Sequence, residues 1–92
     1  MSKLSLDTII TRRDDIPTTD IDGELGMMSI EKGKYFTLDE VGSRIWTLLE
    51  TPNTINKMVE ILMQEYEVDF ETCANDVREL VEKLLQEDLI TA

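Results

Sequence analysis

Histidine is absent from the 92-residue chain, and cysteine and tryptophan each occur once. Without histidine, neither the common zinc ligand sets nor a Cys-His nucleophile can be assembled, and the lone Cys73 cannot form an internal disulfide. No apolar run approaches the roughly 20 residues that cross a bilayer, and the first residues lack the apolar block of a secretion signal. We therefore expect a cytoplasmic protein that is not an enzyme and holds no metal or other cofactor.

Basic residues are scarce as well. Nine lysines and arginines stand against 20 aspartates and glutamates, which gives a formal net charge of −11. Such a charge repels the phosphate backbone of nucleic acids and the surface of anionic membranes. The composition therefore argues against nucleic acid and membranes as partners.

The first part of the chain has the pattern of β-strands. A β-branched run predicts a strand over residues 7–13, after which Pro17 and several aspartates indicate a loop. Residues 25–30 and 34–38 predict a β-hairpin, in which Gly33 takes the positive φ of a tight turn. We expect these three strands to form one antiparallel sheet, which must lay one face on helices to be stable.

Three helices are predicted after the strands. A capping-box pattern with Thr37 as the cap starts the first helix near Asp39. Gly42 interrupts this helix, which suggests that a neighbouring backbone passes close to it. Thr54 opens the second helix, and Asp69 caps a third, longer one.

Strands followed by helices are typical of an α+β fold with the helices on one side of the sheet. The apolar content of 41% suffices for one core, so we expect a single domain over residues 1–92. The second and third helices also resemble a helix-turn-helix, which reads DNA in many proteins. Between residues 69 and 88, however, seven acidic and two basic residues give a net charge of −5, which disfavours contact with phosphates.

The third helix has a wide apolar arc. Its apolar positions cover about 140°, against roughly 100° for a stripe that only covers a core. Two interpretations stay open: the whole arc packs in the core, or its edge with Cys73 and Leu80 lines an exposed groove. Charged residues flank that edge: Asp76, Lys83 and Glu87.

The strand over residues 34–38 has no proline to protect it from pairing with another chain. The unpaired backbone groups of an edge strand bind extended peptides by β-augmentation. Tyr35 and Phe36 point to opposite faces of this strand, so one can anchor in the core while the other stays available. The pattern leaves open which of the two does which.

Three motifs stand out within residues 24–90: Leu-Asp-x-x-Gly-x-x-Ile-Trp at residues 38–46, Tyr-x-Val-Asp at residues 66–69, and a closing Leu-Ile at residues 89–90. In this order and spacing they resemble the PqqD-like family. Members of that family are winged-helix-like domains, so the resemblance implies a winged-helix-like form of the predicted α+β fold. Where many relatives have glycine before the closing pair, this chain has Asp88.

Members of the family serve as recognition elements for ribosomally made, post-translationally modified peptides (RiPPs). They hold the leader segment of the precursor peptide while partner enzymes act on its core. By resemblance, the leader adds as a strand to the third strand and packs against the third helix. Carried over by position, the expected peptide-binding residues are Tyr35, Phe36, Thr37, Cys73, Asp76, Val77, Leu80, Lys83 and Leu84.

The chain looks most like the free-standing version of such elements in lasso peptide biosynthesis, where a separate leader peptidase and a macrocyclase are the partners. The alternative within the family is a peptide chaperone for a radical SAM enzyme, as in the pyrroloquinoline quinone pathway. A winged-helix DNA-binding regulator is a further, less favoured interpretation. A structural homodimer that buries the strand edge is another. For the leader-binding module we expect a monomer or a weak dimer.

Overall fold

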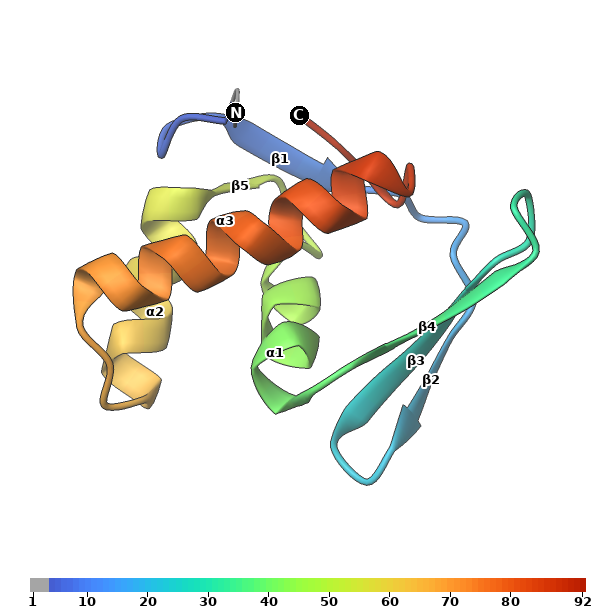
Figure 1. Ribbon diagram of the computed structural model, residues 1–92, viewed down its shortest axis with the longest axis horizontal. Coiled ribbons are helices and arrows are strands. Elements are labelled where there is room, and N and C mark those ends of the chain that lie inside the picture. Colours follow the sequence, from blue (N-terminus) through green and yellow to red (C-terminus); the bar gives the residue numbers. More distant parts are fainter. Residues whose placement is uncertain (1–3) are drawn as a thin grey trace.

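The computed structural model describes residues 4–92, which form two small antiparallel sheets and three helices (Figure 1). One sheet stands out to one side of the helices and is called the wing below. The second sheet joins segments from the start, the middle and the end of the chain. The wing consists of β2 (Thr18–Ile21), β3 (Glu24–Ser29) and β4 (Lys34–Leu38); the second sheet consists of β1 (Ile9–Arg12), β5 (Asn53–Thr54) and β6 (Ile90–Thr91); and the helices are α1 (Glu40–Leu48), α2 (Ile55–Glu65) and α3 (Phe70–Gln86).

The wing contains the predicted hairpin together with an unexpected strand. The hairpin is confirmed, because β3 and β4 pair with Met27 opposite Phe36 and the turn residue Gly33 has a φ of 64°. The other strand is β2, which pairs with β3, so the prediction of a loop over this segment was wrong. The missed signal is the Asp22-Gly23 pair, whose φ angles of 52° and 86° suit the type I′ turn of a two-residue hairpin.

The predicted first strand exists as β1, but it does not join the wing, so that part of the prediction was wrong. It pairs with β5, where Ile10 lies opposite Asn53, and with β6, where Arg12 lies opposite Ile90. Ile10 is fully buried, and the Arg12 guanidinium donates to the Trp46 carbonyl at 2.8 Å and lies 5.2 Å from the centre of the indole ring. These contacts hold β1 on the helices, away from the wing.

Each helix begins at a side-chain cap. Thr54 and Asp69 cap α2 and α3 as predicted, each by accepting a backbone N–H at 3.1 Å. The cap of α1 is Asp39, which accepts the N–H of Gly42 at 2.7 Å, so the prediction of Thr37 as the cap was wrong. A carboxylate at this position also suits the positive end of the helix dipole.

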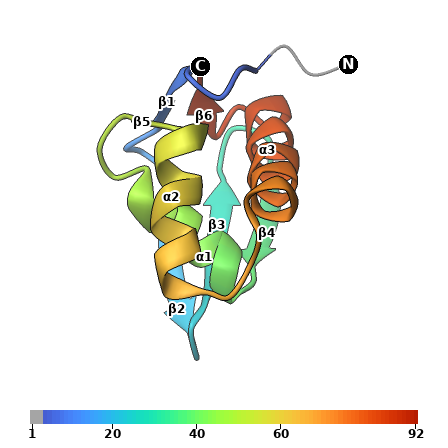
Figure 2. The ribbon, with the colours of Figure 1, turned by 90° about the vertical axis from the view of Figure 1, so that its left-hand side faces the viewer.

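The core lies among the helices, the second sheet and the inner face of the wing. Figure 2 shows α2 and α3 side by side, and Val59 and Val81 from these two helices are fully buried. Ile45 and Trp46 contribute from α1, and Met27 contributes from the wing. The second sheet closes the core at the end where β1 and β6 pair.

The C-terminal end of α3 forms a Schellman motif. The N–H of Asp88 donates to the Leu85 carbonyl at 3.1 Å, and the N–H of Leu89 donates to the Leu84 carbonyl at 3.0 Å. Asp88 has a φ of 59°, a conformation that glycine adopts at lower cost. The turn buries Leu89 and directs the chain into β6.

Candidate functional site

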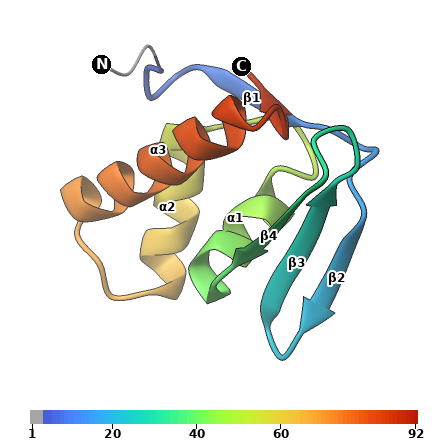
Figure 3. The same cartoon turned by 45° about the vertical axis from the view of Figure 1, so that its right-hand side comes forward.

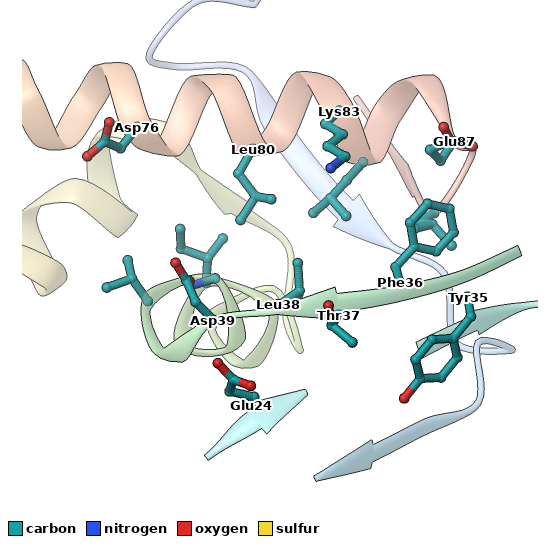
Figure 4. Close-up of a pocket in the computed structure, with 15 residues that line it drawn as sticks. Glu24, Tyr35, Phe36, Thr37, Leu38, Asp39, Asp76, Leu80, Lys83 and Glu87 are labelled. Atoms are coloured by element: carbon teal, nitrogen blue, oxygen red, sulfur yellow. The ribbon is translucent and has the colours of Figure 1, made fainter. Parts of the chain in front are cut away.

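A groove lies between β4 and α3. β4 is the edge strand on the side of the wing nearest the helices, as Figure 3 shows, and β2 forms the far edge. The groove has a volume of about 730 Å³. In Figure 4, α3 forms one wall, and β4 with the start of α1 forms the other. The residues that line it are Glu24, Tyr35, Phe36, Thr37, Leu38, Asp39, Val41, Gly42, Ile45, Asp76, Leu80, Lys83, Leu84, Glu87 and Leu89.

The structure brings most of the predicted binding residues to this groove. Cys73 and Val77 are the exceptions, because they pack in the core and do not line the groove, whereas the equally buried Leu84 does line it. Burial raises the pKa of the Cys73 thiol, and the nearby carboxylate of Asp76 raises it further. The apolar arc of α3 is therefore divided between core and groove. The predicted residues that line the groove are Tyr35, Phe36, Thr37, Asp76, Leu80, Lys83 and Leu84.

The wall of the groove where β4 meets α1 was not predicted from the sequence. Val41 and Ile45 line the groove there, and Ile45, at 2% exposure, also belongs to the core. Gly42 lies at the same place, and the atoms nearest to an added Cβ are side-chain atoms of Leu38 and Asp39, both at 3.2 Å. The predicted close approach of a neighbouring backbone was therefore wrong. The 37% exposure of Val41 distinguishes this wall from an ordinary core face, and no sequence pattern reports exposure.

Hydrogen bonds show to which side the backbone groups of β3 point. The N–H of Met28 donates to the Pro17 carbonyl at 3.1 Å and so points to the β2 side. Successive residues of a strand direct their N–H and C=O groups to opposite sides, so those of Leu25 must point to β4. The hydrogen bonds of the Ser43 hydroxyl support this direction. The hydroxyl accepts the N–H of Leu25 at 2.9 Å and donates to the Leu38 carbonyl at 3.1 Å, and so it bridges β3 and β4.

The same alternation assigns the free edge of β4. Like Leu25, Met27 directs its N–H and C=O groups to β4. Phe36 lies opposite Met27, so its own N–H and C=O groups point to β3. The N–H and C=O groups of Tyr35 and Thr37 therefore point away from β3, on the side of the wing where the groove lies. An unpaired edge of this kind accepts a further strand.

Tyr35 and Phe36 lie on opposite faces of the wing, as predicted. Phe36 is partly buried, packs against the core and points toward α3 in Figure 4. Tyr35 is 54% exposed and points to the outer face, where its ring lies over Gly26. A side chain at position 26 would collide with the tyrosine hydroxyl, so the glycine leaves room for this ring. Phe36 is therefore the aromatic residue that faces α3 across the groove.

Ion pairs fasten the β3–β4 hairpin to the C-terminal end of α3. Lys34 Nζ lies 3.3 Å from Glu87 Oε1, and Lys32 Nζ lies 3.7 Å from the same oxygen and 3.4 Å from the Asp88 carboxylate. Lys32 also donates to the Gln86 carbonyl at 3.2 Å. One exposed pair contributes little, but several that share partners restrict how far β4 can move from α3. The network closes one end of the groove.

The described part of the chain offers no cluster of three or more histidine, cysteine, aspartate or glutamate side chains suited to a metal ion. Within residues 4–92, no helix has the length and apolar character needed to cross a membrane.

A three-stranded wing whose free edge lies beside the longest of three helices defines a small α+β domain of the winged-helix type. The chain belongs to the family described as Coenzyme PQQ synthesis protein D (PqqD), which it matches over residues 24–90. Its resemblance to the PqqD-like family over this range is thereby confirmed.

Solved structures agree with this membership. TbiB1, solved in complex with the TbiA(beta) leader peptide, is 34% identical, with a TM-score of 0.80 over 89% of this chain and 95% of that chain. The PqqD truncation of Methylobacterium extorquens PqqCD, described as a functional, stand-alone RiPP recognition element, is 18% identical, with a TM-score of 0.81 over 97% of this chain and 95% of that chain.

A lasso peptide synthetase B1 complexed with its leader peptide is 21% identical, with a TM-score of 0.76 over 90% of this chain and 98% of that chain. At this identity, this structure and the PqqD truncation show likeness of fold alone. No match was found among proteins of curated function.

Proposed function

We propose that this protein binds the leader segment of a ribosomally made precursor peptide as an added strand on β4. The observation that carries the proposal is the free backbone edge at Tyr35 and Thr37, which lies directly beside a groove walled by α3. TbiB1, at 34% identity, was solved with a leader peptide, which supports the same ligand class for this chain. The leader then gains main-chain hydrogen bonds from the edge and specificity from the groove.

The binding free energy must exceed the cost of ordering the leader. Fixing an extended segment costs about 1–2 kcal/mol per residue, while each net hydrogen bond returns only about 0.5–1.5 kcal/mol. Buried apolar side chains must therefore supply much of the affinity, at about 25 cal/mol per Å² removed from water. Phe36, Leu80 and Val41 offer the accessible apolar surface for this.

The proposed contact residues are the seven predicted ones that line the groove, from Tyr35 on β4 to Leu84 on α3. Cys73 and Val77 serve the site indirectly, because their burial holds α3 in place. We further propose that the protein is not itself a catalyst and works in the cytoplasm as one domain over residues 1–92. In this role it presents the leader to a separate peptidase and then a macrocyclase of lasso peptide biosynthesis.

The test is a titration with the leader of a precursor peptide encoded next to this gene, followed by fluorescence polarisation. The variant Leu80→Glu places an unpaired charge in the middle of the groove and should weaken binding at least about tenfold. Met63→Glu is the matched control, because Met63 is an exposed apolar residue on α2 that does not line the groove. Circular dichroism must show both variants folded. Unchanged leader affinity in folded Leu80→Glu would refute the placement of the leader.

A further inference from the structure

The free edge of β4 determines which side chains of an added strand enter the groove. Tyr35 and Thr37 carry the free backbone groups, so they form the hydrogen-bonded pairs with the new strand. Side chains of directly opposite residues lie on the same face of a sheet. The strand residues opposite Phe36 and Leu38 therefore point into the groove, and the residue between them points to the outer face. The groove contacts two strand positions separated by one residue.

The two ends of the groove differ in charge. Asp39, at the start of α1, and Asp76, on α3, lie toward the same end in Figure 4. Neither carboxylate has a basic partner within residues 4–92, although Asp39 accepts the N–H of Gly42 as the cap of α1, so Asp76 is the less compensated of the two charges. Toward the other end, Lys83 adds a positive charge, and Glu87 is already paired with two lysines. A ligand that spans the groove therefore meets two carboxylates toward one end and the ammonium group of Lys83 toward the other.

Apolar surface accompanies the acidic end. Val41, in the first turn of α1 two residues after Asp39, lines the groove and is 37% exposed. Leu80 lies midway along the α3 wall. Lysine and arginine combine an aliphatic stem with a charged tip, so they suit a site that is apolar near the strand and acidic further out. At the other position, Phe36 is partly exposed beside the buried Leu84 and provides an apolar contact for a side chain without charge.

We propose that the groove selects an extended peptide with lysine or arginine opposite Leu38 and an apolar residue opposite Phe36. This inference rests on the proposed function, because it requires strand addition at β4. The wing is antiparallel throughout, and antiparallel pairs are the commoner kind in sheets. An antiparallel strand passes Leu38 before Phe36. The ligand pattern, from N- to C-terminus, is a basic residue, any residue, and an apolar residue.

The test compares short capped peptides that differ only at their centre: Arg-Thr-Leu, Glu-Thr-Leu and the reversed Leu-Thr-Arg in one Ser/Thr-rich host. Each is titrated into isotope-labelled protein, and the amide shifts of Tyr35 and Thr37 report strand addition. Arg-Thr-Leu should bind about three- to fivefold tighter than Glu-Thr-Leu at low salt, which is the upper part of the range for an exposed ion pair. The difference should shrink as salt screens the charges.

A pair of charge reversals on α3 makes the test specific to the groove. Asp76→Lys should reverse the order of the peptides, so that Glu-Thr-Leu binds tighter than Arg-Thr-Leu. Glu79→Lys makes the same change of charge on an exposed residue of the same helix that does not line the groove, and it should leave the order unchanged. This control separates local contact from the overall charge of the protein.

The outcomes distinguish this inference from strand addition itself. Equal affinities, or an order that Asp76→Lys leaves unchanged, overturn the charge preference, while shifts at Tyr35 and Thr37 still support strand addition. Tighter binding of Leu-Thr-Arg overturns the antiparallel direction. If none of the peptides shifts any amide, the inference fails as well, and strand addition is then decided by the titration with the precursor leader.

Discussion

The substitution Thr37→Pro tests whether the ligand pairs with the free edge of β4. Proline has no N–H, and the N–H of Thr37 points away from β3, so the pairing within the wing loses no hydrogen bond. Proline is tolerated on edge strands when its missing donor faces outward. It also confines the preceding residue to extended conformations, which Phe36 already adopts in β4. The variant should therefore fold.

The loss of affinity follows from the hydrogen bonds of the added strand. The missing N–H removes one bond of about 0.5–1.5 kcal/mol and leaves a carbonyl of the ligand unpaired beside the groove, at about 1–3 kcal/mol. Water can partly hydrate the unpaired carbonyl, so the total loss of binding free energy is about 2–3 kcal/mol. This loss raises Kd roughly 30- to 140-fold. Fluorescence polarisation with the labelled leader measures this range directly.

The far edge of the wing provides a matched control. The backbone N–H and C=O groups of Thr19 and Gly26 point toward each other between β2 and β3. Because this direction alternates along the strand, the N–H of Thr18 points to the free edge of β2. Thr18→Pro therefore makes the same chemical change at an edge that does not border the groove. It should bind the leader as the wild type does. If folded Thr37→Pro binds within about twofold of the wild type, strand addition at β4 is the wrong account.

Three further predictions concern the rest of the fold. Cys73, buried and with a raised pKa, should react with a disulfide reagent such as DTNB only when the protein is unfolded; rapid reaction of the native protein would contradict its place in the core. Asp88→Gly should raise the free energy of unfolding by about 0.5–1 kcal/mol, because glycine adopts the positive φ without strain. Lys32 loses the Asp88 carboxylate but keeps that of Glu87. A lower melting temperature of the variant would contradict this. The Arg44 guanidinium donates to the Glu65 carboxylate at 2.6 Å and lowers its pKa. The ion pair between α1 and α2 therefore contributes its full stabilisation of the folded state above the ordinary pKa of 4.5. This stabilisation is lost as the pH falls through the lowered pKa. Arg44→Met should therefore lower the melting temperature at pH 7 and have less effect in acid, and an effect that persists in acid would show that the loss is one of packing.

Sequence rules succeeded where the controlling contacts are local. Thr54 and Asp69 were recognisable as caps, because a cap acts on N–H groups within the next three residues. Gly33 was recognisable as a turn residue for a similar reason. The error at the start of α1 arose because Thr37 and Asp39 both fit a cap, and Thr37 is instead part of β4.

The predictions failed where distant segments meet. The strand β1 finds its partners at Asn53 and Ile90, and two-residue strands have no pattern that a sequence reveals. The candidate site shows the same limit. Val77 and Leu80 both belong to the apolar arc of α3, yet one is fully buried and the other lines the groove.

By itself, the sequence determined the hairpin, two of the three helix caps, the acidic character and the family, because each depends on residues that are close in the chain or on composition. Only the tertiary structure decided that β1 leaves the wing, that α3 stands opposite β4, and that Tyr35 and Thr37 keep their backbone groups free. Burial and strand pairing depend on which surfaces the whole chain brings together. A groove exists only between elements, so no single segment can encode it.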